Sequence, residues 1–360
     1  NSAMPKLRKT LPKDFQDLIN AGDDEAIKAA LQKCEVGAYY GSSQNTALFY
    51  TGLSREVIAW LLERGEDMNY KNRQGKTPLH AQAERENGAV ALYLELGADI
   101  EAERLFDRET PIFSAIAHYQ TENVKILLEH GADLYKRETL HNRNPLEAML
   151  ASCMNAYIEK TAEIAAIFLN AGMTISEDMK KSVIRIGSDY EFYQSELPPE
   201  FAESAKQGMM RLYELFDVPP VPAVEKHNEN APITVSEGNW WKCHEELWKK
   251  LVPPRGQAGT VQGEVIRCSG KLARELMDNG AMNWDSEYRT MLKKMPEYFK
   301  MGNPLNPAMQ QETESIVLKI LAMKHPEMID NEPERIMEFA VEYVRLNPTP
   351  IHLEKTDYTR

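Results

Sequence analysis

The sequence predicts an all-α protein in two parts, a row of short helix pairs followed by a separate helical domain, and three observations support this. Apolar residues recur at steps of three and four along most of the chain, which is the spacing of one helix face. Glycine follows several of these segments, where a helix readily ends in a left-handed residue. A proline-rich stretch at 219–235 separates the two parts.

The segment 72–99 shows the helix-pair pattern most clearly. Its letters GKTPLH, at 75–80, predict a turn that leads into a helix. Pro78 suits the first helical position, because the N–H that it lacks would have no partner there. Gly97 then ends a second helix, since glycine adopts a positive φ without strain. A turn, two helices and a glycine stop therefore make one structural unit.

This unit resembles the ankyrin repeat. Thr77-Pro78-Leu79-His80 matches the T-P-L-H mark of the family, and Gly97-Ala98-Asp99 matches its G-A-D mark. The resemblance implies that the side chains of Thr77 and His80 hydrogen-bond locally and brace the turn, so that His80 is structural rather than catalytic. It also implies an ankyrin-repeat solenoid, whose hairpin tips and first helices line a concave face that binds a partner.

Further units of the same kind are expected on both sides. In a divergent fourth unit Asn142 replaces the turn glycine, and asparagine tolerates a positive φ better than most residues. The longer stretch 152–160 of that unit forms either extended helices or a protruding loop. The expected units are an N-terminal cap at 15–32, repeats at 45–72, 72–99, 107–133 and 142–172, and a closing unit at 177–218.

The domain boundaries follow from these units. The expected parts are a tag remnant (Asn1-Ser2-Ala3) and lead-in at 1–14, an ankyrin-repeat domain with its caps at 15–218, a proline-rich linker at 219–235, and a helical domain at 236–360.

The second domain carries the pattern L-V-P-x-x-G-Q-A-x-T-V-Q-G-E-x-I-R at 251–267, with a later N-G and N-W. This pattern is similar to a helical module of uncharacterised bacterial proteins, and the resemblance implies a domain but no chemistry. The last dozen residues of the chain either hang loose or pack back onto this domain. Its tryptophans are expected to build the core, although one exposed ring could anchor an interface; they are Trp240, Trp241, Trp248 and Trp284.

Polar residues are densest in the same stretch. A helix over 260–271 would place Glu264, Arg267 and Lys271 along one face. A buried Glu264–Arg267 pair could satisfy polar groups at a junction between helices, or it could grip a ligand. The junction is favoured, because no nucleophile and base accompany the pair. The possible second site comprises Arg255, Gln257, Glu264 and Arg267.

Composition excludes several classes of function. A net charge of −13 would repel a phosphate backbone, so nucleic acid is not an expected partner. No apolar run approaches a membrane span and no signal peptide follows Met4, which predicts a cytoplasmic protein with no membrane contact. No catalytic residue, metal or cofactor is assigned. The cysteines are far apart and predict buried free thiols; they are Cys34, Cys153, Cys243 and Cys268.

The function expected from these features is a protein–protein interaction scaffold. The excess of acid favours a basic partner, and a more specific hypothesis is an immunity or toxin-neutralising protein. The alternatives are an enzyme or ligand-binding protein with its site in the second domain, and an effector delivered to a host cell. The residues expected to bind the partner are Tyr70, Arg73, Gln74, Lys76, Arg85, Arg104, Phe106, Arg108, His118, Tyr119, His141 and Arg143.

Overall fold

A computed structural model describes residues 6–360, so the expected tag remnant, Asn1 to Ala3, lies outside the described residues. Helices make up 54% of the structure, in sixteen α-helices within this range, and there is little strand. The prediction of a mainly helical protein is therefore confirmed. None of the helices at 6–360 is both long enough and apolar enough to cross a membrane.

The chain forms two compact units. The first unit runs to Tyr190 and includes Leu197–Val221, and the second comprises Glu191–Glu196 and Pro222–Arg360. The chain passes from one unit to the other between Val221 and Pro222, within the stretch predicted to be a linker. All four cysteines are free and buried, as predicted.

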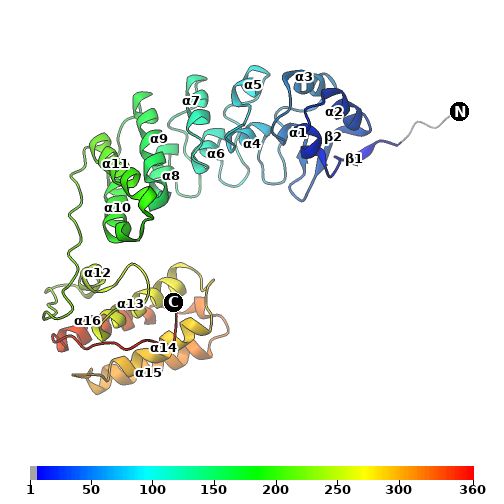
Figure 1. The fold of residues 1–360 in the computed structure, drawn as a ribbon. Helices are drawn as coiled ribbons and strands as arrows, with labels where there is room; N and C mark the ends of the chain where they lie inside the picture. The colour runs from blue at the N-terminus through cyan, green and yellow to red at the C-terminus, as the bar shows by residue number, and fades with distance from the viewer. Residues whose placement is uncertain (1–5) are drawn as a thin grey trace. The chain divides into compact units, whose positions relative to one another are not determined.

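The helices of the first unit stack in two layers (Figure 1). In one layer α4, α6 and α8 contact one another in series, and in the other α5, α7, α9 and α11 do the same. The helices are α1 (Phe15–Asn20), α2 (Asp24–Leu31), α3 (Arg55–Glu63), α4 (Pro78–Ala83), α5 (Val90–Glu95), α6 (Pro111–Ala117), α7 (Thr121–Glu129), α8 (Pro145–Ser152), α9 (Ile158–Asn170), α10 (Glu177–Tyr193) and α11 (Pro199–Phe216).

Proline opens the first helix of three successive pairs, at the position that the sequence predicts for Pro78. Thr77 and His80 form a capping box, in which the Thr77 N–H donates to His80 Nδ1 over 3.1 Å. The His80 Nε2–H donates to the carbonyl of Glu109 over 3.0 Å, which ties the cap to the next loop. This confirms the predicted structural role of Thr77 and His80.

The next pair shows what happens when the histidine is missing. Phe113 occupies the position of His80, and the side chain of Thr110 makes no cap hydrogen bond. The Thr110 hydroxyl is buried and has no hydrogen-bond partner within residues 6–360. The third pair restores the box with different residues, because Asn144 and Glu147 bond reciprocally.

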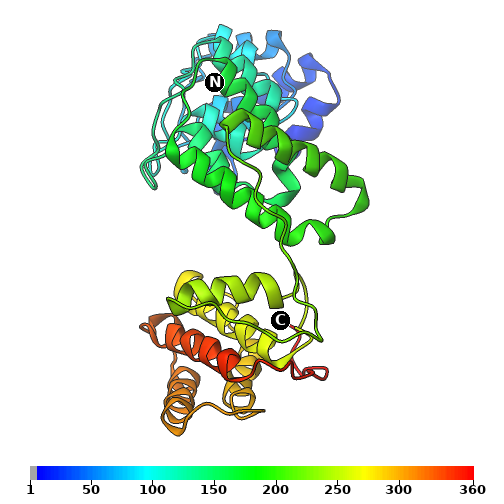
Figure 2. The same ribbon diagram turned by 90° about the vertical axis from the view of Figure 1, so that its left-hand side faces the viewer.

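The loops that precede α4, α6 and α8 extend to the same side of the unit (Figures 1 and 2). A backbone hydrogen bond closes each loop on itself, and the three donors are Asn72, Arg104 and Glu138. Asn142 adopts a φ of 53°, as its place in the predicted turn required. Thr139 N–H donates to the carbonyl of Asp107, so neighbouring loops are also joined.

Two features of the first unit were not settled by the sequence. A three-stranded sheet in the order β1-β2-β3 was not predicted; its strands are β1 (Arg8–Thr10), β2 (Cys34–Tyr40) and β3 (Asn45–Thr46). β1 pairs parallel with β2, and β3 pairs antiparallel with it. The stretch 152–160 forms a short 3-10 turn at Asn155–Tyr157 and the start of the thirteen-residue α9.

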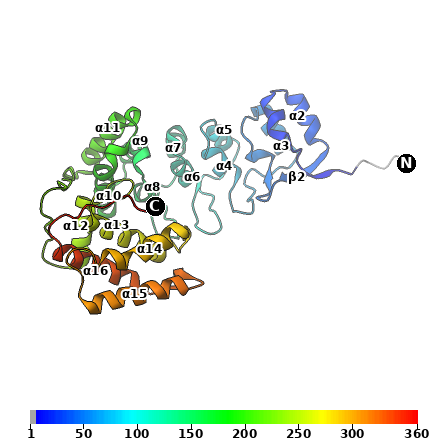
Figure 3. The same cartoon turned by 60° about the horizontal axis from the view of Figure 1, so that its bottom comes forward.

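The second unit is built around α13, nearly every residue of which is buried. α13 contacts α12, α14 and α16, and α14 also contacts α15. In Figure 3, α14 lies next to α13, and α15 packs against α14. The helices are α12 (Trp240–Leu251), α13 (Val261–Ala273), α14 (Ser286–Tyr298), α15 (Pro307–Ala322) and α16 (Glu332–Leu346), and a π-helical turn at Arg274–Asp278 continues α13.

The end of the chain packs back onto α13, which decides between the two alternatives for the last dozen residues. The buried Gln262 amide donates to the carbonyls of Asn347 and Thr349 and accepts from the Ile351 N–H. Tyr358 is buried in the core of the unit.

Lowering the pH is expected to destabilise the first unit through His80. Burial lowers the pKa of His80 from 6.5 to about 4. As the pH falls, the His80 ring therefore takes up its proton at a higher pH in the unfolded chain than in the folded one. The contribution of His80 to the unfolding free energy is complete above about pH 6.5 and is lost as the pH falls toward about 4. Between about pH 7 and pH 4.5, the wild type should lose about 2–3 kcal/mol more unfolding free energy than His80→Gln, whose amide suits the same capping position.

Urea unfolding followed by circular dichroism at both pH values measures this difference. His141→Gln, which removes an exposed histidine of the same unit, is the control and should follow the wild type. An unchanged pH dependence in His80→Gln would contradict the prediction.

Candidate functional site

The residues predicted to bind a partner separate into two groups. The loop at Arg104–Arg108 lies before the N-terminus of α6, and His118 and Tyr119 lie at its C-terminus. Seven helical residues separate the two ends by about 10 Å. Tyr119 stacks on Tyr157, with ring centroids 4.3 Å apart. The predicted residues therefore lie toward both ends of α6.

The group at the helix ends borders a cavity of about 790 Å³ in the first unit. His118 and Tyr119 line it together with Met154 and Tyr157. Burial raises the pKa of the Tyr119 hydroxyl to about 12, so this group stays neutral at physiological pH. Arg85 is not among the residues that line this cavity, and its guanidinium donates to the Thr51 hydroxyl over 2.9 Å.

The loop group is less basic than the sequence suggested, because most of its cations are paired within the unit. Lys76 pairs with Glu84, and Arg104 pairs with Asp107 at 3.2 Å. Arg108 pairs with Glu103, whose pKa falls to about 2 through hydrogen bonds from Arg108 and Lys136. The expected basic cluster is thus compensated by acidic residues of the same and neighbouring loops.

The remaining predicted residues of this group differ in exposure. The ring of Tyr70 is half-buried and packs edge-on against Phe49. Arg143 is also half-buried, and its backbone N–H donates to the Glu138 carboxylate over 3.0 Å. The exposed residues are Arg73, Gln74 and His141.

Large apolar side chains stand exposed on the same loops. The exposed fraction is 64% for Leu105, 80% for Phe106 and 69% for Leu140, and we call these three residues the apolar loop cluster. The Thr139 hydroxyl donates to the carbonyl of Phe106 over 3.2 Å, which holds the two loops together. Sequence reasoning selected Phe106 and missed the two leucines. The sequence did hold a signal for the two leucines. Both lie in predicted turns, where an apolar side chain does not belong to the buried face of a helix.

Two residues of the predicted second site, Glu264 and Arg267, belong to a buried network. Glu264 is fully buried and Arg267 nearly so, and their side chains meet at 2.6 Å. The Gln257 side-chain oxygen accepts a hydrogen bond from the Thr356 N–H, near the end of the chain, over 2.8 Å. Arg255 is exposed and takes no part in this network. The helix expected over 260–271 is present as α13, with Thr260 as its N-cap.

Glu264 satisfies several donors at once. Its carboxylate accepts from the Ala258 N–H over 2.7 Å and from the Tyr358 hydroxyl over 3.0 Å. The Cys268 thiol donates to it as well. These contacts join the start of α13 to the end of the chain.

The tryptophans of the second unit do not build its core, in contrast to the prediction. Trp241 is 50% exposed, and Trp240, Trp248 and Trp284 are half-buried. The reason lies in the register of α12, whose inward face is formed by residues at steps of four, such as Cys243 and Leu247.

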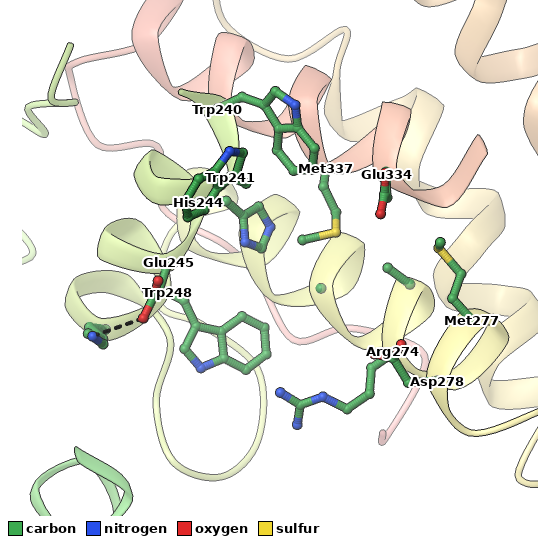
Figure 4. A pocket seen from close by; sticks show the side chains of 13 residues that line it. Trp240, Trp241, His244, Glu245, Trp248, Arg274, Met277, Asp278, Glu334 and Met337 are labelled. Atoms are coloured by element: carbon green, nitrogen blue, oxygen red, sulfur yellow. Dashed lines mark hydrogen bonds and ion pairs between the residues drawn. The ribbon is translucent and has the colours of Figure 1, made fainter. Parts of the chain in front are cut away.

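The three tryptophans of α12 instead line a surface pocket of about 420 Å³ (Figure 4). Met337 of α16 and Met277 of the π-helical turn face them. His244 stacks on Trp248 and contacts the Ser269 hydroxyl at 2.9 Å. Burial lowers the pKa of His244 to about 4, so the imidazole is neutral at physiological pH.

Gly270 forms part of the pocket wall by its lack of a side chain. A Cβ at this position would lie 2.7 Å from Cζ3 of Trp248 and 3.2 Å from Cε1 of His244. The close approach of these two rings to α13 therefore requires glycine at this position.

Removing the Glu264 carboxylate is expected to destabilise the second unit strongly. Glu264→Ala leaves the buried Arg267 without its counter-ion, and such a change costs about 3–5 kcal/mol. Urea unfolding followed by tryptophan fluorescence reports mainly on this unit, because four of the five tryptophans lie in it. Glu245→Ala, which breaks the exposed pair with Lys249, should cost less than about 1 kcal/mol. Similar losses in the two variants would contradict the prediction.

Comparison of the chain with models of known protein families and with curated proteins gives no match.

Proposed function

We propose that this chain is an ankyrin-repeat protein that binds a partner protein on the loop side of its first unit. The capping of α4 by Thr77 and His80 supports the ankyrin identity, as does the spacing of the loops. The backbone donors Asn72, Arg104 and Glu138 recur at 32 and 34 residues, close to the length of an ankyrin repeat.

The observation that carries the binding proposal is the apolar loop cluster. Exposed apolar groups are common singly, but large ones on adjoining loops mark a surface that is buried in a complex. Leu105 also has a fixed position, because Gly75 of the preceding loop approaches its backbone N closely. Fixed side chains lose little conformational entropy on binding, which favours affinity.

The charges around the cluster suit a polar rim. The ion pairs Arg104–Asp107 and Arg108–Glu103 surround the apolar residues and leave Arg73 exposed. The net charge of −13 favours a basic partner, and the more specific proposal is an immunity or toxin-neutralising protein of the cytoplasm. That form of the proposal predicts a toxic product among the neighbouring genes, which a toxicity-rescue assay would detect.

The alternative is an enzyme or ligand-binding protein with its site in the second unit. Glu264, Arg267 and Gln257 hold the end of the chain, which leaves them little freedom for catalysis. A binding role for this unit is therefore better sought among side chains that the fold leaves unpaired.

Polar substitution of the apolar loop cluster is expected to abolish partner capture. The double variant Phe106→Ser with Leu140→Ser removes two side chains that a partner would bury, and such anchors contribute about 2 kcal/mol or more each, or roughly 30-fold in affinity. The measurement is quantitative capture from a lysate of the source organism with the full-length chain as bait. Charge reversal at Arg73, which no ion pair constrains among residues 6–360, should weaken capture less.

The matched control is Phe201→Ser with Met210→Ser. These residues are also exposed, at 53% and 61%, but lie on α11 of the same unit and away from the loops. The control should retain every partner that the wild type retains. Equal recovery with the loop variant and the wild type would refute binding at the loops, provided that circular dichroism shows both variants folded.

A further inference from the structure

One face of α13 carries a series of cations. Arg267, Lys271 and Arg274 follow one another at steps of four and three, which places them on the same side of the helix and its π-helical continuation. All three line one cavity of the second unit, together with Arg255 and Arg360. This concentration of positive charge is unusual in a chain whose net charge is −13.

Lys271 forms no ion pair in the part of the chain that the structure describes. Its side chain is half-buried, and no hydrogen bond or ion pair engages it anywhere in residues 6–360. Burial lowers the pKa of Lys271, and the nearby Arg267 and Arg360 cations lower it further. Arg274 is likewise without a partner in the described part of the chain.

Two acidic residues, Asp285 and Glu287, also line this cavity, and each has a partner at the end of the chain. Asp285 accepts from the Arg360 guanidinium over 2.6 Å, and Glu287 accepts from the Thr359 N–H over 2.6 Å. Glu264 is buried against Arg267. None of these carboxylates forms an ion pair with Lys271 or Arg274 within residues 6–360.

We propose that Lys271 and Arg274 bind the phosphate group of a small phosphorylated organic molecule. A phosphate monoester carries close to two negative charges at neutral pH, which balances two cations, whereas a carboxylate balances one. The lysine supplies a point charge and the arginine a planar pair of donors, a combination that suits a tetrahedral oxyanion.

The same cavity offers a surface for the organic part of the ligand. Trp248, Pro253 and Pro254 line it beside the cations. Trp248 and Arg274 also belong to the tryptophan pocket of Figure 4, so the phosphate site and the aromatic surface adjoin. The inference concerns the second unit and does not depend on partner binding by the loops.

Isothermal titration calorimetry of the full-length chain with phenyl phosphate tests this inference. The titration is made at low salt and near pH 7.5, with inorganic phosphate and benzoate as comparison ligands. Phenyl phosphate should bind saturably and at least tenfold more tightly than benzoate, which has the same ring and half the charge. Inorganic phosphate should bind more weakly than phenyl phosphate, because it lacks the group that contacts Trp248.

The variants Lys271→Gln and Arg274→Gln should each weaken phenyl phosphate binding at least tenfold. The matched control is Lys293→Gln, which removes an exposed cation of α14 outside the cavity and should bind as the wild type does. Absence of saturable binding, equal weakening in the control, or equal affinity for benzoate would overturn the proposal. Equal affinity for inorganic phosphate would overturn the part assigned to the organic group.

Thermal unfolding gives an independent readout that a merely structural lysine would not reproduce. In phosphate-free buffer Lys271→Gln should melt no lower than the wild type, because it removes an uncompensated, half-buried charge. Phenyl phosphate should then raise the melting temperature of the wild type and of Lys293→Gln but not that of Lys271→Gln. A marked loss of stability in Lys271→Gln without ligand would show that the ammonium already has a structural partner and would overturn the proposal.

Discussion

Polar groups that a fold buries must find partners, and this constraint shapes both units of the protein. In the first unit both ring nitrogens of the buried His80 have partners only when the ring is neutral, because Nδ1 accepts from Thr77 and Nε2 donates to Glu109. In the second unit Glu264 meets it by collecting donors from Ala258, Arg267 and Tyr358. An unpaired polar group in either place would cost more than the net value of a single hydrogen bond.

Several residues that the sequence offered for binding already have partners within the fold. Arginines on the loops look like binding residues in the sequence, but Arg104 and Arg108 already hold carboxylates of their own loops. Glu264 and Arg267 look like an acid–base pair, but they hold the end of the chain against α13. Residues engaged in this way stabilise the fold, and binding is better sought among groups that the fold leaves unsatisfied.

Two sets of side chains are unsatisfied in that sense. Leu105, Phe106 and Leu140 expose apolar surface to water, although the loops that carry them are held by backbone hydrogen bonds. Lys271 is half-buried among cations and lacks an acceptor within residues 6–360. The first set lowers its free energy by meeting an apolar surface, and the second by meeting an anion, so the two sets call for different ligands.

The sequence by itself determined the local elements of this protein. The preferences of a few adjacent residues explain the helix start at Pro78, the cap at Thr260 and the glycine stop at Gly97. They also explain the left-handed Asn142 and the shared polar face of α13. These preferences act over one or two helical turns, so neighbouring letters are enough to read them.

The tertiary structure decided which side chains pair and which remain free. β1 pairs with β2 across more than twenty residues, and Tyr358 reaches Glu264 from the far end of the chain, so neither contact has a local signal. The exposure of Trp241 depends on the register of α12 against its neighbours. Whether a charge is compensated depends on residues that folding brings together from distant positions, and for that reason the free Lys271 could be recognised only in the folded chain.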